Sequence, residues 1–136
     1  MTPTRGERNN NPGNIERNTI RWQGMSDDQS GDKRFIVFDT PEMGIRALAK
    51  LLLNYQNIHD LNTITQIINR WAPSNENNTS AYVNAVANEV GVKPDDKINL
   101  NDLETLSKLV TAIIRHENGR VIYAEATISG VTGALV

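Results

Sequence analysis

The clearest pattern in the chain is the helical spacing of apolar residues between residues 40 and 119. In four segments these residues recur three or four positions apart, which places them on one face of an α-helix. The pattern predicts helices over about 40–59, 62–72, 79–90 and 101–119, and a weaker fifth helix over 121–129.

The residues at the ends of these segments agree with the predicted helices. Thr40 followed by Pro41 is typical of an N-cap and a first helical position. Pro73 would stop the second helix, and Gly91 would end the third. Asp102 lies in the sequence NDLE, which resembles a capping box. The boundaries therefore follow from local chemistry as well as from periodicity.

The remaining segments predict little regular structure. Residues 1–33 are rich in Asn, Gly, Arg and Asp and lack periodicity, and SNENNT at 74–79 is polar, so we expect loops there. RFIVF at 34–38 is β-prone and predicts a strand of a small hairpin. Nothing resembles a repeat or an interdomain linker. We therefore expect one domain over 1–136, mainly α with a small β element near 34–38.

Composition excludes several classes of function. The 14 basic and 16 acidic side chains give a net charge of −2, which argues against nucleic acid as a partner. The chain has no cysteine and two histidines, so we expect no metal site and no other cofactor. The N-terminus lacks the apolar core of a signal peptide, and the longest strongly apolar run, 51–53, is too short to span a bilayer.

One acid interrupts the apolar face of the predicted fourth helix. Leu103, Leu106, Val110, Ile113 and Glu117 are spaced 3, 4, 3 and 4 residues apart, so Glu117 continues the seam. The helix should carry this carboxylate toward the core or the floor of a cleft. A carboxyl group in that position is the type that serves as a general acid. In the alternative interpretation, Glu117 lies in solvent at the helix end or pairs with a nearby arginine.

The segment RNNNPGNI at 8–15 holds four asparagines, a proline and a glycine. It is either a solvated loop or an ordered loop whose amides line a polar cleft, because asparagine offers donors and acceptors that suit sugar hydroxyl and N-acetyl groups.

The aromatic residues also have two interpretations each. Tyr82 and Trp71 lie on apolar helix faces and are either core residues or cleft residues. Trp22 lies in a loop, where it would stack on a sugar or anchor the loop. His116 points about 100° away from Glu117 around the helix, so we expect it at the surface. Thr79 is most simply the N-cap of its helix.

Three segments together resemble the small lysozyme-like, peptidoglycan-degrading enzymes of bacteriophages: RGERNNNPGNI, FIVFDTPEMGIRAL and AIIRHENG. The chain is also similar to lytic transglycosylases of the goose-lysozyme type, whose catalytic glutamate lies in a segment like ESGFNP, followed later by one like ETxxYV. Here HENG resembles the opening of the first segment, NNNPGNI its continuation, and NTSAYV the second. The order of these segments looks circularly permuted.

The resemblance implies roles for particular residues. Glu117 matches the catalytic glutamate, and Tyr82 matches the tyrosine near that acid. Glu16 stands where the family pattern has a basic residue, and Glu7 occupies a variable position; either would serve as a second acid. The candidate substrate-binding residues are Asn11, Asn14, Trp22 and Thr79.

The function implied by the resemblance is cleavage of the β-1,4 bond between N-acetylmuramic acid and N-acetylglucosamine. A lytic transglycosylase needs one glutamate and yields a 1,6-anhydro sugar, whereas a hydrolysing muramidase uses a second acid. A chitin-type substrate, or a non-catalytic virion protein that binds glycan, is the alternative. We expect a monomer acting on peptidoglycan in the periplasm or cell wall, delivered by a phage virion, a holin or a secretion system, without stable membrane insertion.

Overall fold

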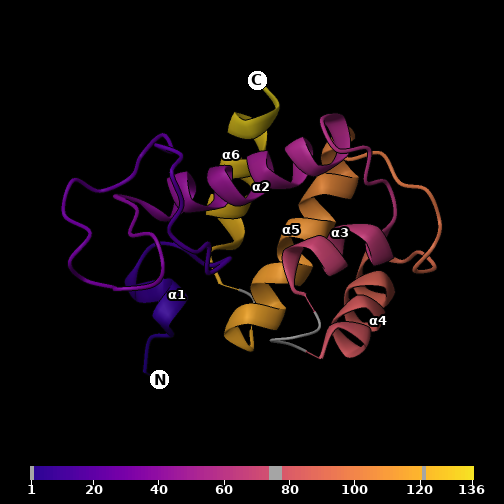
Figure 1. Cartoon of the computed structure of the whole chain (residues 1–136), viewed down its shortest axis with the longest axis horizontal. Coiled ribbons are helices and arrows are strands. Elements are labelled where there is room, and N and C mark those ends of the chain that lie inside the picture. The colour runs from indigo at the N-terminus through magenta and orange to yellow at the C-terminus, as the bar shows by residue number, and fades with distance from the viewer. Residues whose placement is uncertain (1, 74–77, 121) are drawn as a thin grey trace.

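The computed structural model of the protein describes residues 2–73, 78–120 and 122–136. It is mainly helical, as the periodicity predicts (Figure 1). The helices are α1 (Arg5–Arg8), α2 (Pro41–Asn57), α3 (Ile64–Trp71), α4 (Thr79–Val90), α5 (Leu103–Asn118) and α6 (Ala124–Leu135). The four central predictions are confirmed to within a few residues. The fifth helix is confirmed in type, but it begins at Ala124 and continues to Leu135; position 121 and most of the predicted loop at 74–79 lie outside the described residues.

The predicted caps account for where α2 and α5 begin and where α4 and α5 end. The Thr40 hydroxyl accepts a hydrogen bond from the Met43 backbone N–H at 3.3 Å, and the Asp102 carboxylate accepts one from Thr105 at 3.1 Å. Gly91 and Gly119 follow α4 and α5 with φ angles of 86° and 78°, the left-handed region that favours glycine.

The N-cap of α4 differs from the prediction. The side chain of Asn78 accepts the capping hydrogen bond from the Ala81 N–H at 3.2 Å, and Thr79 is the first residue of the helix. Thr79 is buried, and its hydroxyl donates to the Ala72 carbonyl instead. Asparagine caps as well as threonine does, and the chain offers both side by side.

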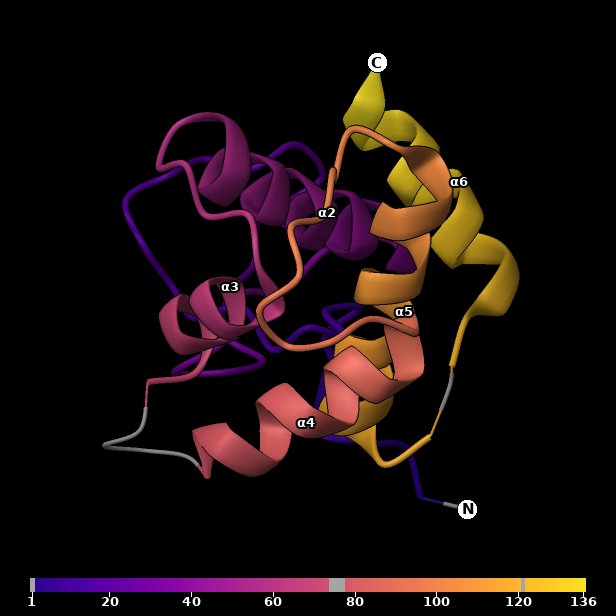
Figure 2. The same ribbon diagram turned by 90° about the vertical axis from the view of Figure 1, so that its right-hand side faces the viewer.

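Helix α5 forms the centre of the packing. It contacts α4, α6, α2 and α1, while α2 packs along α6; Figures 1 and 2 show α5 between α4 and α6. Leu106, Val110 and Ile113 of its predicted seam are fully buried. Leu103, which was predicted to begin that seam, is the first residue of α5 and is 45% exposed. None of the described helices is long and apolar enough to cross a membrane.

The predicted strand at 34–38 does not form. Among the described residues the β structure is limited to isolated bridges, Glu16 with Phe35 and Met25 with Phe38. The backbone of this segment bonds to three separate stretches: Ile36 donates to Ile15, Phe38 donates to Asn9, and Val37 accepts from Ser26. Because each stretch pairs over only one or two residues, no continuous ladder develops.

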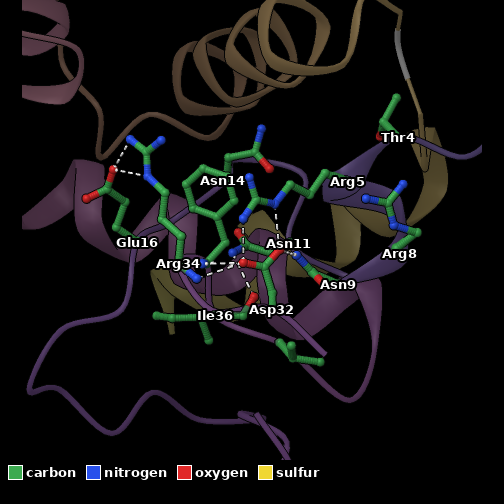
Figure 3. A network of polar contacts seen from close by, with 12 residues as sticks. Thr4, Arg5, Arg8, Asn9, Asn11, Asn14, Glu16, Asp32, Arg34 and Ile36 are labelled. Atoms are coloured by element: carbon green, nitrogen blue, oxygen red, sulfur yellow. Dashed lines mark hydrogen bonds and ion pairs between the residues drawn. The ribbon is translucent and has the colours of Figure 1, made fainter. Parts of the chain in front are cut away.

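Asp32 organises the N-terminal loop (Figure 3). Its carboxylate accepts hydrogen bonds from the Arg5 guanidinium at 2.6 and 2.7 Å and from the Asn9 amide at 2.9 Å. It also accepts the backbone N–H groups of Arg34 and Phe35 at 2.8 and 2.9 Å. The Arg5 hydrogen bond is the main reason that the pKa of Asp32 lies well below its ordinary value. The segment predicted to be loop is thus an ordered loop, and it also contains the short helix α1.

Gly44 allows α2 to pack directly on this loop. A Cβ atom added at Gly44 would overlap the carbonyl oxygen of Asn10, which is rigid backbone. Gly133, inside α6, is the matched control, since an added Cβ there would be 3.8 Å from the nearest atom, the flexible Arg46 side chain. We expect Gly44→Ala to lower the free energy of unfolding by about 2 kcal/mol through overpacking. Gly133→Ala should be neutral or slightly stabilising, because alanine is the better helix former.

Urea denaturation of the two variants would test this difference in packing. Equal stability of Gly44→Ala and the unsubstituted protein would show that the loop can move away from α2 at little cost.

Candidate active site

Glu117 lies in the last turn of α5, half-buried, with both carboxylate oxygens hydrogen-bonded. The Tyr82 hydroxyl donates to Oε2 at 3.0 Å, and the Asn14 side-chain amide donates to Oε1 at 3.1 Å. Glu117 therefore does not lie free in solvent, and it forms no ion pair with an arginine among the described residues. The structure brings together three of the predicted site residues, which come from α5, α4 and the N-terminal loop.

Tyr82 is a buried hydrogen-bond donor behind the acid. It projects from the first turn of α4, is 2% exposed, and accepts a hydrogen bond from the Trp71 indole N–H at 3.1 Å. Its ring stacks on that of His116, with centroids 3.6 Å apart, although His116 itself is exposed as predicted. Burial, followed by the nearby charge of Glu117, raises the pKa of the Tyr82 hydroxyl, so this group remains protonated across the physiological range.

Glu117 opens onto a cleft with a volume of about 1010 Å³. The cleft runs between the N-terminal loop on one side and α2 with the end of α3 on the other. Its lining is mixed, with carboxylates, guanidinium groups, amides and aromatic rings, a combination suited to a large polar ligand with some apolar faces. The lining residues are Gly13, Asn14, Ile15, Glu16, Arg17, Asn18, Arg34, Phe35, Leu51, Tyr55, Trp71, Ala72, Pro73 and Glu117.

The loop that holds Asn14 is fixed from two directions. Asn14 has a left-handed backbone with φ of 52°, a conformation that asparagine tolerates better than most residues. Asn118, next to the acid, donates to the Pro12 carbonyl at 2.8 Å and accepts from the Thr4 hydroxyl at 2.6 Å. The end of α5 is thereby tied to the same loop that presents Asn14. Among the described residues, the Asn14 side-chain oxygen is buried without a hydrogen-bond partner.

Asn11, predicted to face the cleft, is fully buried beneath it. Its amide donates to the carbonyls of Ile15 and Ile36 at 3.0 and 2.9 Å, and its oxygen accepts the Ile15 N–H at 3.0 Å. These bonds use the side chain to replace backbone pairing within the loop. Asn11 therefore shapes the loop, and the prediction that it binds substrate directly is wrong.

Two other predicted substrate-binding residues also lie away from the cleft. Trp22 is 6% exposed and packs in the core, which favours its loop-anchoring interpretation over stacking on a sugar. Thr79 is buried, with its hydroxyl directed at the Ala72 carbonyl at 2.5 Å. Neither residue lines the cleft.

The two candidate second acids have different surroundings. Glu7 forms a capping box with Thr4, pairs with Arg120 and does not line the cleft, so it is not placed to act beside Glu117. Glu16 does line the cleft, at an exposed position, and pairs with Arg34 through a 2.9 Å hydrogen bond to the guanidinium Nε. Of these two acids, Glu16 alone lines the cleft.

Two residues of the site were not assigned to it by sequence reasoning. Trp71 lines the cleft and bonds to Tyr82, whereas a tryptophan at the end of an amphipathic helix favours a core interpretation. Asn118 reads in the sequence as one more polar residue at a helix end, and only the fold shows that it is buried and bonded to the N-terminal loop. Within the described part of the chain, no three His, Cys, Asp or Glu side chains are grouped so as to hold a metal ion.

Comparison with known proteins shows that the chain is related to a bacteriophage protein. The chain is 43% identical over 118 residues to Protein P5 of Pseudoalteromonas phage PM2, and the aligned region covers 85% of this chain and 71% of that protein. No family model matches the chain. At this identity and coverage, the chain belongs to the same family as Protein P5 of this phage.

Proposed function

We propose that this protein cleaves the β-1,4 bond between N-acetylmuramic acid and N-acetylglucosamine in bacterial peptidoglycan, with Glu117 as its general acid and base. The observation that carries the proposal is the position of Glu117: a half-buried carboxyl held by Tyr82 and Asn14 in the wall of a large polar cleft. A solvent-exposed helix-end glutamate would have no need of two separate donors from distant segments.

In the proposed reaction, protonated Glu117 donates its proton to the glycosidic oxygen as the bond from that oxygen to C1 breaks. Positive charge develops at C1 of the muramic acid. The Glu117 carboxylate then takes the proton from the 6-hydroxyl of the same sugar, whose oxygen bonds to C1. The product is a 1,6-anhydro sugar, and no water is consumed. Tyr82 and Asn14 hold the carboxyl in place and stabilise its charged form between the two steps.

Hydrolysis is the second candidate, because Glu16 lines the same cleft as Glu117. A second carboxylate would activate water for attack on C1. Glu16 would have to leave its ion pair with Arg34 to do so, or else act while still hydrogen-bonded. The transglycosylase reaction needs no such change, which is why we prefer it.

The contacts between segments also support the resemblance to transglycosylases. The carboxyl of HENG meets the NNNPGN loop through Asn14 and the AYV segment through Tyr82, although these residues are 103 and 35 positions away in the chain. That proximity is what a circularly permuted relative requires. The phage family is consistent with a virion-associated enzyme that acts as a monomer on the cell wall and reaches it through a virion, a holin or a secretion system.

Mass spectrometry of the products released from purified sacculi would test the proposal. We expect muropeptides that are lighter by one water than reducing-end products, the signature of 1,6-anhydro formation. Reducing-end products that disappear in Glu16→Gln would indicate the hydrolase instead. Failure to release any product, combined with retention of the protein on sacculi in a pull-down, would contradict cleavage and favour a non-catalytic glycan-binding protein of the virion.

A further inference from the structure

Trp71 joins two parts of the site that have otherwise separate roles. It is the last residue of α3 and is part of the cleft lining. Its indole N–H also reaches the Tyr82 hydroxyl at 3.1 Å, and that hydroxyl reaches Glu117 at 3.0 Å. A chain of two hydrogen bonds thus runs from the indole through the phenol to the acid.

The donor and the acceptor of each hydrogen bond follow from the chemistry of the groups. An indole N–H can only donate, so the Tyr82 oxygen must be its acceptor. The phenol has a single proton on a rotatable bond. With the indole on one side of the oxygen, the position that remains for that proton points at the Glu117 oxygen Oε2. The indole therefore selects one of the orientations that the hydroxyl would otherwise adopt.

Among the described residues, the Tyr82 hydroxyl forms hydrogen bonds only with Trp71 and Glu117. The side chain is 2% exposed, and His116 covers one face of its ring, so bulk water does not set the hydroxyl orientation. Removing the indole N–H would leave a buried phenol oxygen without its donor, and such a group gains from rotating to find another. The loss would then weaken the hydrogen bond to Glu117, although the Trp71 indole N–H bonds to Tyr82 and not to Glu117 itself.

We infer that Trp71 is a positioning residue, whose indole N–H holds the Tyr82 hydroxyl so that its proton is directed at Glu117. The inference rests on the proposed function of Glu117 for its effect on turnover, but the hydrogen-bond chain can be tested without any activity. It also differs from the simpler role of a cleft-wall aromatic ring on which a sugar stacks.

The first test uses NMR of the indole N–H groups in the full chain. The protein has two tryptophans, so two indole signals are expected, and Trp22→Phe assigns them. Trp22 is the internal reference, because among the described residues its indole nitrogen has no hydrogen-bond partner. We expect Tyr82→Phe to shift the Trp71 signal upfield and to speed its hydrogen exchange at least about tenfold, while the Trp22 signal stays in place. A Trp71 signal unaffected by Tyr82→Phe overturns the inference, whatever the turnover.

The second test is a double-mutant cycle on turnover of soluble peptidoglycan strands. Trp71→Phe keeps an aromatic ring but removes the N–H, and we expect kcat to fall roughly threefold to tenfold, the effect of one net hydrogen bond. In the Tyr82→Phe background the same substitution should change kcat less than about twofold, because the hydrogen bonds from Trp71 to Tyr82 and from Tyr82 to Glu117 are already lost. Trp22→Phe is the matched control and should leave kcat unchanged.

The alternatives give different results. If Trp71 serves only as a sugar platform, Trp71→Phe raises KM by the same factor in both backgrounds and kcat shows no coupling, which overturns the inference. A fall in kcat that persists unchanged in the Tyr82→Phe background also overturns it. If the unsubstituted protein releases no product while the Trp71 signal responds to Tyr82→Phe, the proposed function fails and the hydrogen-bond chain stands.

Discussion

Glu117→Gln is expected to lower the rate of muropeptide release from sacculi by at least about a thousandfold while leaving the fold intact. General acid–base catalysis by one side chain typically contributes about 10²–10⁴-fold, and here the same carboxyl supplies both the acid and the base. Glutamine has the shape of glutamate but can neither give up nor take a proton at these positions. The effect should therefore fall on the rate of chemistry rather than on binding.

The site can accept glutamine without rearranging its backbone. The glutamine oxygen can still accept the Tyr82 hydrogen bond. Its NH₂ group would face the Asn14 amide, and a flip of that amide would present the Asn14 oxygen, which has no partner among the described residues in the unsubstituted protein. We accordingly expect the melting temperature to change by no more than about 2 °C, an amount that corresponds to less than 1 kcal/mol in a chain of this size.

Glu104→Gln is the matched control, because Glu104 is exposed in the first turn of the same helix, where it forms a surface ion pair with Lys108. It should cleave sacculi at the unsubstituted rate. A Glu117→Gln variant that keeps more than a tenth of the activity would show that another residue is the general acid, and Glu16 would be the next residue to replace.

Asp32→Ala is expected to lower the free energy of unfolding by about 3 kcal/mol, the largest effect on stability that we predict. The substitution removes the carboxylate that pairs with the Arg5 guanidinium. It also leaves the backbone N–H groups of Arg34 and Phe35 without their acceptor. Breaking a buried charged pair costs about 3–5 kcal/mol, and we take the low end because the Arg5 side chain is 44% exposed. Urea denaturation would measure the difference.

Asp27→Ala is the control for Asp32, because Asp27 forms an ion pair with Arg21 in which both side chains are largely exposed. Exposed pairs of this kind contribute little, so its stability should be close to that of the unsubstituted protein. Equal losses from the two substitutions would mean that the Asp32 network does not hold the loop.

The pH dependence of stability gives an independent test of the same carboxylate. Because the pKa of Asp32 is depressed in the folded protein, its contribution is present above the unfolded pKa of about 3.9 and is lost as the pH falls below that value. Between about pH 5 and pH 2, the unsubstituted protein should therefore lose stability more steeply than Asp32→Asn, which cannot titrate at this position. Parallel curves would contradict the depressed pKa.

Local chemistry was sufficient to predict the helical part of the fold. Thr40, Pro41 and Gly119 act within one turn of their own positions, so their signals can be read without knowing the tertiary structure. The β element predicted at 34–38 forms only as isolated bridges, without the hairpin strand, for the complementary reason. Its β propensity is real, but a strand needs a partner of matching length, and its partners are three short pieces of loop that only the fold brings together.

The site was predictable to the extent that one residue interrupts a pattern. Glu117 stands out because it is polar on an apolar seam. Tyr82 agrees with the core pattern, and only the family resemblance placed it near the acid, whereas nothing in the sequence indicated the hydrogen bond of Trp71. Asn11 and Asn14 have the same side chain within one loop, yet one is fully buried and the other reaches the acid. Which amide turns inward depends on the backbone path of the loop, and composition does not report that path.

The hydrogen bonds that hold the N-terminal loop have a consequence for synthesis of the protein. Thr4, Glu7, Pro12 and Asn14 find partners at residues 117–120, which are between 103 and 114 positions later in the chain. A nascent chain can therefore form the loop's bonds to Asp32 and Ile36 early, but the loop's contacts with the end of α5 have to wait, so the cleft is complete only after α5 has been translated. In the proposed function, the growing polypeptide would remain inert toward glycan strands until α5 had been made.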